Sequence, residues 1–258
     1  MFSMESIKSR ILDVWDETPD VKSFLIENNI DEMPKPGQFY EIYVKGIGEA
    51  PISIASWKDG LLFSVKRVGK LTEIMHKLQK NDYLWIRGPY GNGFPYDDNF
   101  TILIAGGIGL PPIRSYIEYS LSKGKRELQL LYGARTPSDI VYRNLLSEWS
   151  ELFDVQITVD KGDKYWKGNV GVVTTLFNRI KKKNAKFLIV GPEIMMKFSV
   201  IELKKIGVNE ENIFLSMERK MKCGFGICGH CNIGRYYVCK DGPIFQYSKI
   251  KDIPEIFY

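Results

Sequence analysis

Short apolar or alternating runs, separated by turn residues, fill the first hundred positions of the chain. The runs are RILDVW, VKSFLIE, QFYEIYV, ISIAS, LLFSVKRV and DYLWIRG, and the turn segments include PKPG, KDG and GPYGNG. Several short strands at this spacing predict an antiparallel β-barrel. One helical pattern, from about Leu71 to Leu78, interrupts them, and we expect that helix to cover an open end of the barrel.

The pattern changes at Thr101. Apolar strand-like runs (TILIAGG, ELQLLYG, DVQITVD, FLIVGP, NIFLSM) now alternate with helical ones (IRSYIEYSLSKG, VYRNLLSEW, VTTLFNRIKKK, EIMMKFSVIELKKIG). Strands alternating with helices of this length predict an α/β doubly wound domain with a parallel sheet. The segment FPYDDNF, residues 94–100, is the expected linker between the two halves.

After Ser216 the periodicity ends, and a tail rich in glycine and cysteine follows. Such a tail is too small to build its own core without a metal to hold it. We therefore predict three parts: a β-barrel domain over residues 1–97, an α/β nucleotide domain over 98–216, and a small metal-binding C-terminal segment over 217–258.

Charge and composition exclude several function classes. The net charge of +5 arises from 36 basic and 31 acidic residues that are interspersed, which disfavours a nucleic-acid partner. The run Lys181 to Lys183 is expected to be a solvated helix end. No stretch reaches the roughly eighteen apolar residues of a membrane span, so cytoplasmic residence is the expectation. His76 and His230 are the only histidines, which disfavours hydrolysis that uses a histidine base.

All four cysteines lie in the tail. Cys223, Cys228 and Cys231 are separated by four and two residues, and Cys239 follows after seven more. The first spacings are those of plant-type two-iron, two-sulfur ferredoxins, whereas a disulfide framework would spread its cysteines along the chain. The alternative is a structural zinc site, although zinc sites usually have two Cys-x2-Cys knuckles and this tail has one. We expect His230 to lie at the surface or behind the ligands.

Glycines in the cysteine segment suit such a site. Gly224, Gly226, Gly229 and Gly234 freely adopt the positive φ that a tight loop needs. Their backbone amides would then reach the cluster sulfurs and help to set its potential.

Two glycine-containing turns follow strands of the α/β half. In TILIAGGIGLPPIR, glycines lie between a buried strand and a helix, where a dinucleotide pyrophosphate can approach the backbone. A second turn, Gly191-Pro192, closes a later strand. Both should lie at the carboxyl ends of strands, where such sheets bind ligands. A tight connection without a ligand, and a core role for Met196, are the alternatives. Arg135 ends another strand and would contact a phosphate or be an ordinary loop cation.

Two segments of the predicted barrel suit a flavin. The stretch from Pro51 to Ser56 has small side chains beside which an isoalloxazine ring fits, and the run from Val65 to Thr72 enters a helix whose first amides suit a pyrophosphate. The alternative for both segments is turn chemistry alone.

The order of these parts resembles the ferredoxin-reductase superfamily over essentially the whole chain. The resemblance rests on PISIAS, VGKLT, GPYGNGF, AGGIGLPP, VGPEIMM, ERKMKCGFGICGHCNIG and YVCKDGPIF, in that order. It is nearest to the branch of electron-transfer subunits with a C-terminal 2Fe-2S cluster. That branch includes the electron-transfer subunits of anaerobic sulfite reductase and of dihydroorotate dehydrogenase, and the gamma subunit of soluble hydrogenases.

The resemblance implies FAD, a 2Fe-2S cluster and NAD(P)H as cofactors, and a partner catalytic subunit in a hetero-oligomer. The cofactors carry the chemistry, so no conventional catalytic residue is expected. The implied flavin residues are Pro51, Ile52, Ser53, Ile54, Ala55, Lys66, Arg67, Val68, Gly69, Lys70 and Thr72. The implied nicotinamide residues are Gly106, Gly107, Ile108, Gly109, Gly191, Pro192 and Met195. The implied cluster ligands are Cys223, Cys228, Cys231 and Cys239.

This chain departs from the family pattern at two positions. Ala50 replaces an arginine that grips the flavin pyrophosphate in the dihydroorotate branch, and Arg67 is the candidate substitute. Val190 replaces a cysteine that lies beside the nicotinamide in many members. Sulfite reductase is the leading hypothesis, and hydrogenase or dihydroorotate dehydrogenase is the next. A free-standing NAD(P)H-ferredoxin type reductase and a zinc-holding binding module are the rival classes. NADH or NADPH, and the direction of electron flow, stay open.

Overall fold

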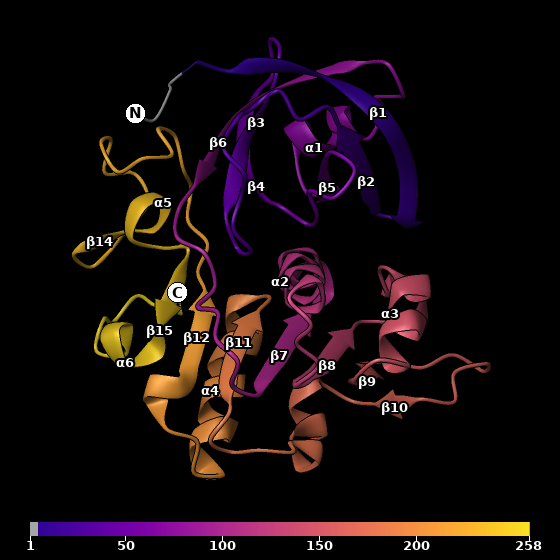
Figure 1. Ribbon diagram of the computed structural model, residues 1–258, viewed down its shortest axis with the longest axis vertical. Coiled ribbons are helices and arrows are strands. Elements are labelled where there is room, and N and C mark those ends of the chain that lie inside the picture. The colour runs from indigo at the N-terminus through magenta and orange to yellow at the C-terminus, as the bar shows by residue number, and fades with distance from the viewer. Residues whose placement is uncertain (1–4, 258) are drawn as a thin grey trace.

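Six antiparallel strands form the first half of the chain, as the alternating runs predict. The computed structural model describes residues 5–257, and the barrel occupies the upper part of Figure 1. The strands are β1 (Ile7–Thr18), β2 (Val21–Ile26), β3 (Phe39–Val44), β4 (Gly48–Ser53), β5 (Leu61–Lys66) and β6 (Tyr83–Tyr90). Their order is β4-β3-β6-β1-β2-β5. Backbone hydrogen bonds from Leu62 to Ser56 (2.8 Å) and from Ala55 to Leu62 (2.9 Å) join the two ends of this order.

The predicted strand ISIAS is displaced in the structure. β4 begins at Gly48 and ends at Ser53, so only its last residues belong to the expected run. Residues 54–56 instead turn toward β5 and make the bonds that join the ends of the barrel. The helix α1 (Lys70–Met75) is shorter than expected and buries Met75 in the barrel core.

A seven-stranded sheet forms the second half. The strands β7 (Thr101–Gly106), β8 (Leu128–Ala134), β9 (Asp154–Val159), β10 (Asn169–Val170), β11 (Lys186–Val190), β12 (Ile213–Ser216) and β15 (Ile244–Gln246) lie in the order β10-β9-β8-β7-β11-β12-β15. All neighbours pair in parallel except β12 and β15. The short β10 has no counterpart in the sequence pattern.

Helices cover both faces of this sheet because its central strands are apolar on both sides. In β7, Ile102 and Ile104 pack toward α4 (Glu193–Lys205) and the 3-10 helix η3 (Val173–Arg179). Leu103 and Ala105 pack toward α2 (Leu110–Ser122) and α3 (Arg143–Ser150). The remaining 3-10 turns are η1 (Gly107–Gly109), η2 (Pro137–Asp139) and η4 (Glu210–Asn212). This is the predicted doubly wound arrangement.

The prediction that Lys181 to Lys183 end a helix is wrong. The 3-10 helix η3 ends at Arg179, and the lysines lie in the following turn. The Lys181 amide donates to the Gln129 side chain, and its ammonium group lies 3.3 Å from Asp154. These tertiary contacts end the helical pattern before the lysines, which are exposed as expected.

The tail lies against both halves, at the left of Figure 1. It contains β13 (Asn232–Ile233), β14 (Tyr236–Tyr237), α5 (Val238–Asp241), β15 and α6 (Tyr247–Ile250). Because β15 pairs with β12, the tail completes the edge of the parallel sheet.

The division of the chain into three parts at residues 97 and 216 stays a proposal. None of the helices within residues 5–257 has the length and apolar character to cross a membrane.

Asn92, just after β6, holds the tail from the barrel side. Its amide group donates to the carbonyls of Asp241 (3.0 Å) and Ile244 (2.9 Å), and its side-chain oxygen accepts from the Ile244 amide (3.0 Å). We expect Asn92→Ala to weaken tail docking by about 1–3 kcal/mol, because these bonds are lost together. Hydrogen exchange at the β15 amides should accelerate accordingly. The control Asn28→Ala, at an exposed turn residue, should leave β15 protection unchanged. Equal protection in both variants would contradict the assigned role.

Candidate functional site: cysteine segment and interdomain interface

The four cysteines form two pairs near the tip of the tail. The sulfur atoms of Cys231 and Cys239, both buried, lie 3.3 Å apart. Cys223 is half-buried and hydrogen-bonds to the exposed Cys228. All the predicted ligands therefore lie close together, three of them in the loop from Cys223 to Cys231 and the fourth, Cys239, in α5.

Backbone amides point at these sulfurs. The Gly226 amide donates to the Cys239 sulfur (3.1 Å), the Ile227 amide to Cys223 (3.4 Å), and the Cys239 amide to Cys231 (3.4 Å). Gly224 and Gly226 have φ of 86° and 82°, the left-handed region that glycine favours. Amides that converge on sulfur are the environment that an iron–sulfur cluster requires, so the segment fits the predicted group.

The thiols of Cys223 and Cys239 differ in pKa. Burial acts to raise the pKa of Cys223, but amide and thiol hydrogen bonds from the loop outweigh it and lower the pKa to about 6. Burial and the neighbouring Cys231 thiol raise the pKa of Cys239 to about 12. The loop thus already stabilises negative charge on the Cys223 sulfur.

The zinc alternative can be compared with the arrangement of the described thiols. Among residues 5–257, no group of three or more His, Cys, Asp or Glu side chains converges as ligands of one ion. A structural zinc site needs its four ligands around one centre. A 2Fe-2S cluster would be held by four thiolates, and the Cys231–Cys239 and Cys223–Cys228 pairs would supply them.

A charged cluster from the barrel lies beneath the Cys223 loop. Arg87 on β6 pairs with Glu49 on β4 and donates to the carbonyls of Lys222 and Cys223. Glu41, opposite Arg87 in the β3–β6 register, is fully buried, and neither of its oxygens has a partner among the described residues. Burial raises the pKa of Glu41 to about 7, although the Arg87 charge lowers it.

The predicted nucleotide turns lie side by side. β7 neighbours β8 on one side and β11 on the other, so the strand order reverses between β7 and β11, and a doubly wound sheet binds its ligand at such a point. Val190 is level with Ala105, which places the turn after β11 beside the turn after β7.

Glycines allow these two turns to approach each other. A Cβ at Gly109 would collide with the Val190 carbonyl, and one at Gly106 would collide with the Met195 sulfur. Gly107, with φ of 51°, faces open space instead, since an added Cβ would meet nothing within 4 Å. Gly106, Gly107, Gly109, Gly191 and Met195 therefore come together, as predicted from their places in the sequence.

The predicted flavin segments lie on the barrel near this edge. Arg67, Val68, Gly69 and Lys70 are exposed, and a Cβ at Gly69 would meet no atom within 4 Å, so the backbone there is accessible to a ligand. The Thr72 hydroxyl accepts from the amides of Val68 (2.9 Å) and Gly69 (3.0 Å), which fixes the turn. Lys66 forms an ion pair with Asp20, with 3.2 Å between its Nζ and Oδ2 of the carboxylate.

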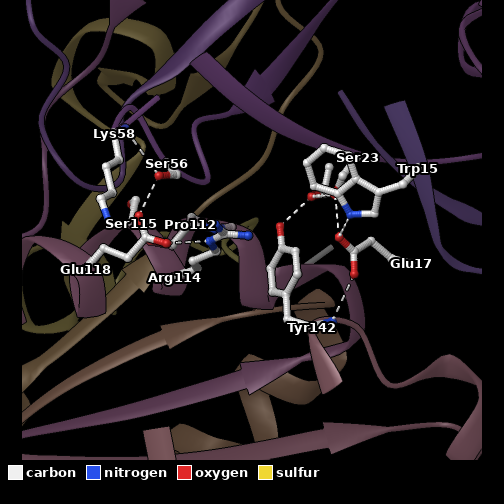
Figure 2. Close-up of polar contacts among 11 residues, drawn as sticks. Trp15, Glu17, Ser23, Ser56, Lys58, Pro112, Arg114, Ser115, Glu118 and Tyr142 are labelled. Atoms are coloured by element: carbon white, nitrogen blue, oxygen red, sulfur yellow. Dashed lines mark hydrogen bonds and ion pairs between the residues drawn. The ribbon is translucent and has the colours of Figure 1, made fainter. Parts of the chain in front are cut away.

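Figure 2 shows a polar network that holds the barrel against the nucleotide domain. Ser56, the last residue of the predicted flavin stretch, donates to Glu118 on α2 (2.5 Å), and Arg114 binds the other oxygen of Glu118 (2.7 Å). Because α2 begins at the glycine turn and η1 contacts β5, the predicted flavin and nucleotide segments lie close to each other at this interface.

Tyr142 forms the second half of the network. Its hydroxyl bonds to Ser64 in the barrel, and its amide donates to Glu17 (3.3 Å), which also accepts from Ser23 (2.7 Å). Its φ of 54° is uncommon for a bulky residue. The guanidinium of Arg114 lies over its ring at 4.8 Å.

Sequence reasoning did not identify Arg87, Glu49, Glu118 or Tyr142. The one available signal was a charged residue inside an apolar strand, as in YLWIRGPY for Arg87. The partners of these residues lie far away in the chain, and Arg87 is 136 residues from Cys223.

Two family models match the chain. Residues 103–200 match the oxidoreductase NAD-binding domain. Residues 218–251 match the iron–sulfur cluster binding domain of dihydroorotate dehydrogenase B. These matches agree with the predicted nicotinamide and iron–sulfur cofactors and favour iron–sulfur over zinc.

Relatives of known description match nearly the whole chain. Sulfhydrogenase 2 subunit gamma of Pyrococcus furiosus is 38% identical, over 94% of this chain and 95% of its own. A probable dihydroorotate dehydrogenase B (NAD(+)) electron transfer subunit of Thermococcus kodakarensis is 39% identical, over 93% and 96%. The structure of an NADH-dependent reduced ferredoxin-NADP oxidoreductase superimposes with a TM-score of 0.81 and 26% identity, covering 96% of this chain and 91% of that one.

The paired thiols, the glycine turns at the strand reversal and these matches agree with one another. The chain belongs to the ferredoxin-reductase superfamily, in the branch of oxidoreductase electron-transfer proteins that join an NAD-binding domain to a C-terminal iron–sulfur domain.

Proposed function

We propose that this chain is the electron-transfer subunit of a multi-subunit oxidoreductase and passes electrons between NAD(P)H, FAD, a 2Fe-2S cluster and a partner catalytic subunit. The observation that carries the proposal is the position of the cysteine loop. Its inner side rests on the barrel, whereas Cys228 is exposed and Ile227 is 77% exposed. The site therefore has one side toward the flavin domain and one side toward a partner.

The division of chemistry follows from the cofactors. When bound, the nicotinamide supplies electrons in pairs, the flavin exchanges pairs for single electrons, and the cluster carries one at a time. The part of the chain itself is to position these cofactors. Gly107 leaves the backbone open to the nucleotide, whereas Gly106 and Gly109 let the turns after β7 and β11 approach each other. The Ser56–Glu118 bond holds the proposed flavin segment against α2.

The flavin assignment rests on the accessible backbone of residues 67–70 and on the fold. A Neisseria gonorrhoeae ferredoxin NADP+ reductase with bound FAD and NADP shares this fold, with a TM-score of 0.68 and 20% identity. Arg67 is exposed at this edge and is the proposed substitute for the family arginine that Ala50 replaces.

The terminal acceptor is proposed from the relatives. Their names support a hydrogenase or a dihydroorotate dehydrogenase as the partner. Sulfite reductase, which the tail motifs favour, stays a prediction that these relatives do not test. Cytoplasmic residence is also proposed, because the chain's four cysteines all belong to the cluster site and leave none for a structural disulfide.

Replacing Cys231 by Ser tests the ligand assignment. We expect loss of the cluster's visible absorption and of inorganic sulfide, with FAD retained, because the flavin segments lie on the barrel. Visible spectra and iron and sulfide analysis give the result. His230→Gln is the matched control, since His230 is exposed and lies next to Cys231. An intact cluster in the Cys231 variant would refute the ligand set.

Replacing Gly107 by Ala tests the nucleotide turn. The added methyl group would occupy the space that the pyrophosphate needs, so the Kd for NADH or NADPH should rise about tenfold or more, equivalent to about 1.4 kcal/mol. Gly124→Ala is the matched control, because Gly124 also has positive φ and open space and lies at the far end of α2. Both variants carry a similar backbone cost of about 1–2 kcal/mol. Equal nucleotide affinity in the two variants would contradict the site.

Purification under native conditions tests the partner. An affinity-tagged chain isolated anaerobically from its own cells should carry a second redox polypeptide with it. The pure chain should oxidise NAD(P)H with artificial acceptors but should not turn over hydrogen, sulfite or dihydroorotate. A chain that elutes alone and reduces soluble ferredoxin would support the free-standing reductase instead.

A further inference from the structure

The Arg87 guanidinium is a buried cation at the junction between the barrel and the cysteine loop. Its side chain is 7% exposed. Nε and Nη2 bind the Glu49 carboxylate at 3.0 and 2.7 Å, and Nη1 donates to the Tyr90 hydroxyl at 3.3 Å. Nη2 also donates to the Lys222 carbonyl (2.5 Å), and Nη1 donates to the Cys223 carbonyl. One side chain therefore joins two barrel strands to the residue that carries the first cluster ligand.

This junction is packed tightly by the residues next to Cys223. A Cβ at Gly224 would lie 2.7 Å from the Tyr90 ring and 3.3 Å from Nη1 of Arg87. The Phe225 ring also packs against this junction, with its centre 6.3 Å from that of Tyr90. The absence of a side chain at position 224 allows the backbone to sit directly on the guanidinium.

Arginine is suited to this position for two reasons. Its planar fork can bind a carboxylate and two carbonyls at once, whereas a lysine ammonium is a single point of charge. A buried charge is also screened less than an exposed one, so it acts over a longer distance. Glu49 offsets part of that charge. Removing the Arg87 charge makes the electrostatic potential at the loop more negative, and removing the Glu49 charge makes it more positive.

We propose that Arg87 is a positioning residue that fixes the first cluster-ligand loop through the Lys222 and Cys223 carbonyls and raises the reduction potential of the cluster with its charge. This inference rests on the proposed function, because it takes Cys223 as a ligand. The negative charge of Glu49 opposes this effect and keeps the reduction potential of the cluster lower than it would be with Arg87 alone.

Three variants separate charge from geometry. Arg87→Gln removes the charge and should favour the oxidised cluster by about tenfold, a shift of about −59 mV for a one-electron couple. Glu49→Gln removes the opposing charge and should shift the potential upward. Arg87→Lys keeps the charge, so its potential should stay near that of the wild type while a chelator removes its iron faster. Arg10→Gln is the control, since Arg10 on β1 forms an exposed ion pair with Glu27, which directly follows β2.

The measurements are iron and sulfide per chain and the cluster potential from a redox titration followed by electron paramagnetic resonance. All titrations use one pH, because Glu41 also faces Arg87. Shifts of the reduction potential in opposite directions for Arg87→Gln and Glu49→Gln support the proposal. Damage to the loop would instead lower the cluster content of both variants and would not shift their potentials in opposite directions. Shifts of the same sign, or no shift, overturn it.

Cluster content distinguishes the possible failures. If Arg87→Gln retains no cluster, the reduction potential of Glu49→Gln tests the charge effect. An upward shift of that potential supports the effect, and an unchanged potential overturns it. A wild-type chain without sulfide would overturn the cluster assignment itself, and this inference with it. Full cluster content with an unchanged potential in every variant would overturn the role of Arg87 and leave the assignment intact.

Discussion

The tail cannot bury enough apolar surface by itself, so its position depends on contacts with the two larger domains. β15 completes the sheet beside β12, Asn92 binds the tail near β15, and Arg87 binds the carbonyls at its cysteine loop. This docking constrains the rest of the site. It places the cysteine loop beside the barrel, on which the predicted flavin segments lie, and leaves Cys228 at the surface.

A second set of contacts joins the barrel to the nucleotide domain. Ser56 with Glu118, and Tyr142 with Ser64 and Glu17, supply polar contacts between the two domains. A hydride passes only between rings in contact, so two domains that share such a transfer must hold a fixed relation. These side chains hold the barrel and the nucleotide domain in one such relation.

Local patterns predicted much of this molecule. The cysteine spacing and the glycines at positions 106, 107 and 109 are short-range signals, because each reflects a loop whose residues are neighbours in the chain. The change from alternating strands to strand–helix repeats likewise predicted the two domains. The pattern was less informative where tertiary contacts decide the structure, as at Lys181, whose amide and ammonium bind Gln129 and Asp154 instead of extending a helix.

Long-range contacts were not predictable in the same way. Arg87 and Glu49 read as ordinary strand charges, and nothing near them in the sequence indicates the Cys223 carbonyl. Tyr142 reads as an apolar helix residue, yet its positive φ and its bonds to Ser64 and Glu17 arise only when the domains meet. Burial within an apolar strand, as for Glu41 and Arg87, is a feature that only the folded structure reveals.

If the proposed function is correct, electrons from a nicotinamide nucleotide reach a cluster within this one chain. This transfer can be followed by adding NADH or NADPH anaerobically to the purified protein and recording visible and electron paramagnetic resonance spectra. We expect about two irons and two sulfides per chain, bleaching of the flavin absorption, and the appearance of a reduced-cluster signal. Zinc in place of iron and sulfide, or a flavin that bleaches while the cluster stays oxidised at any nucleotide concentration, would contradict the proposed function.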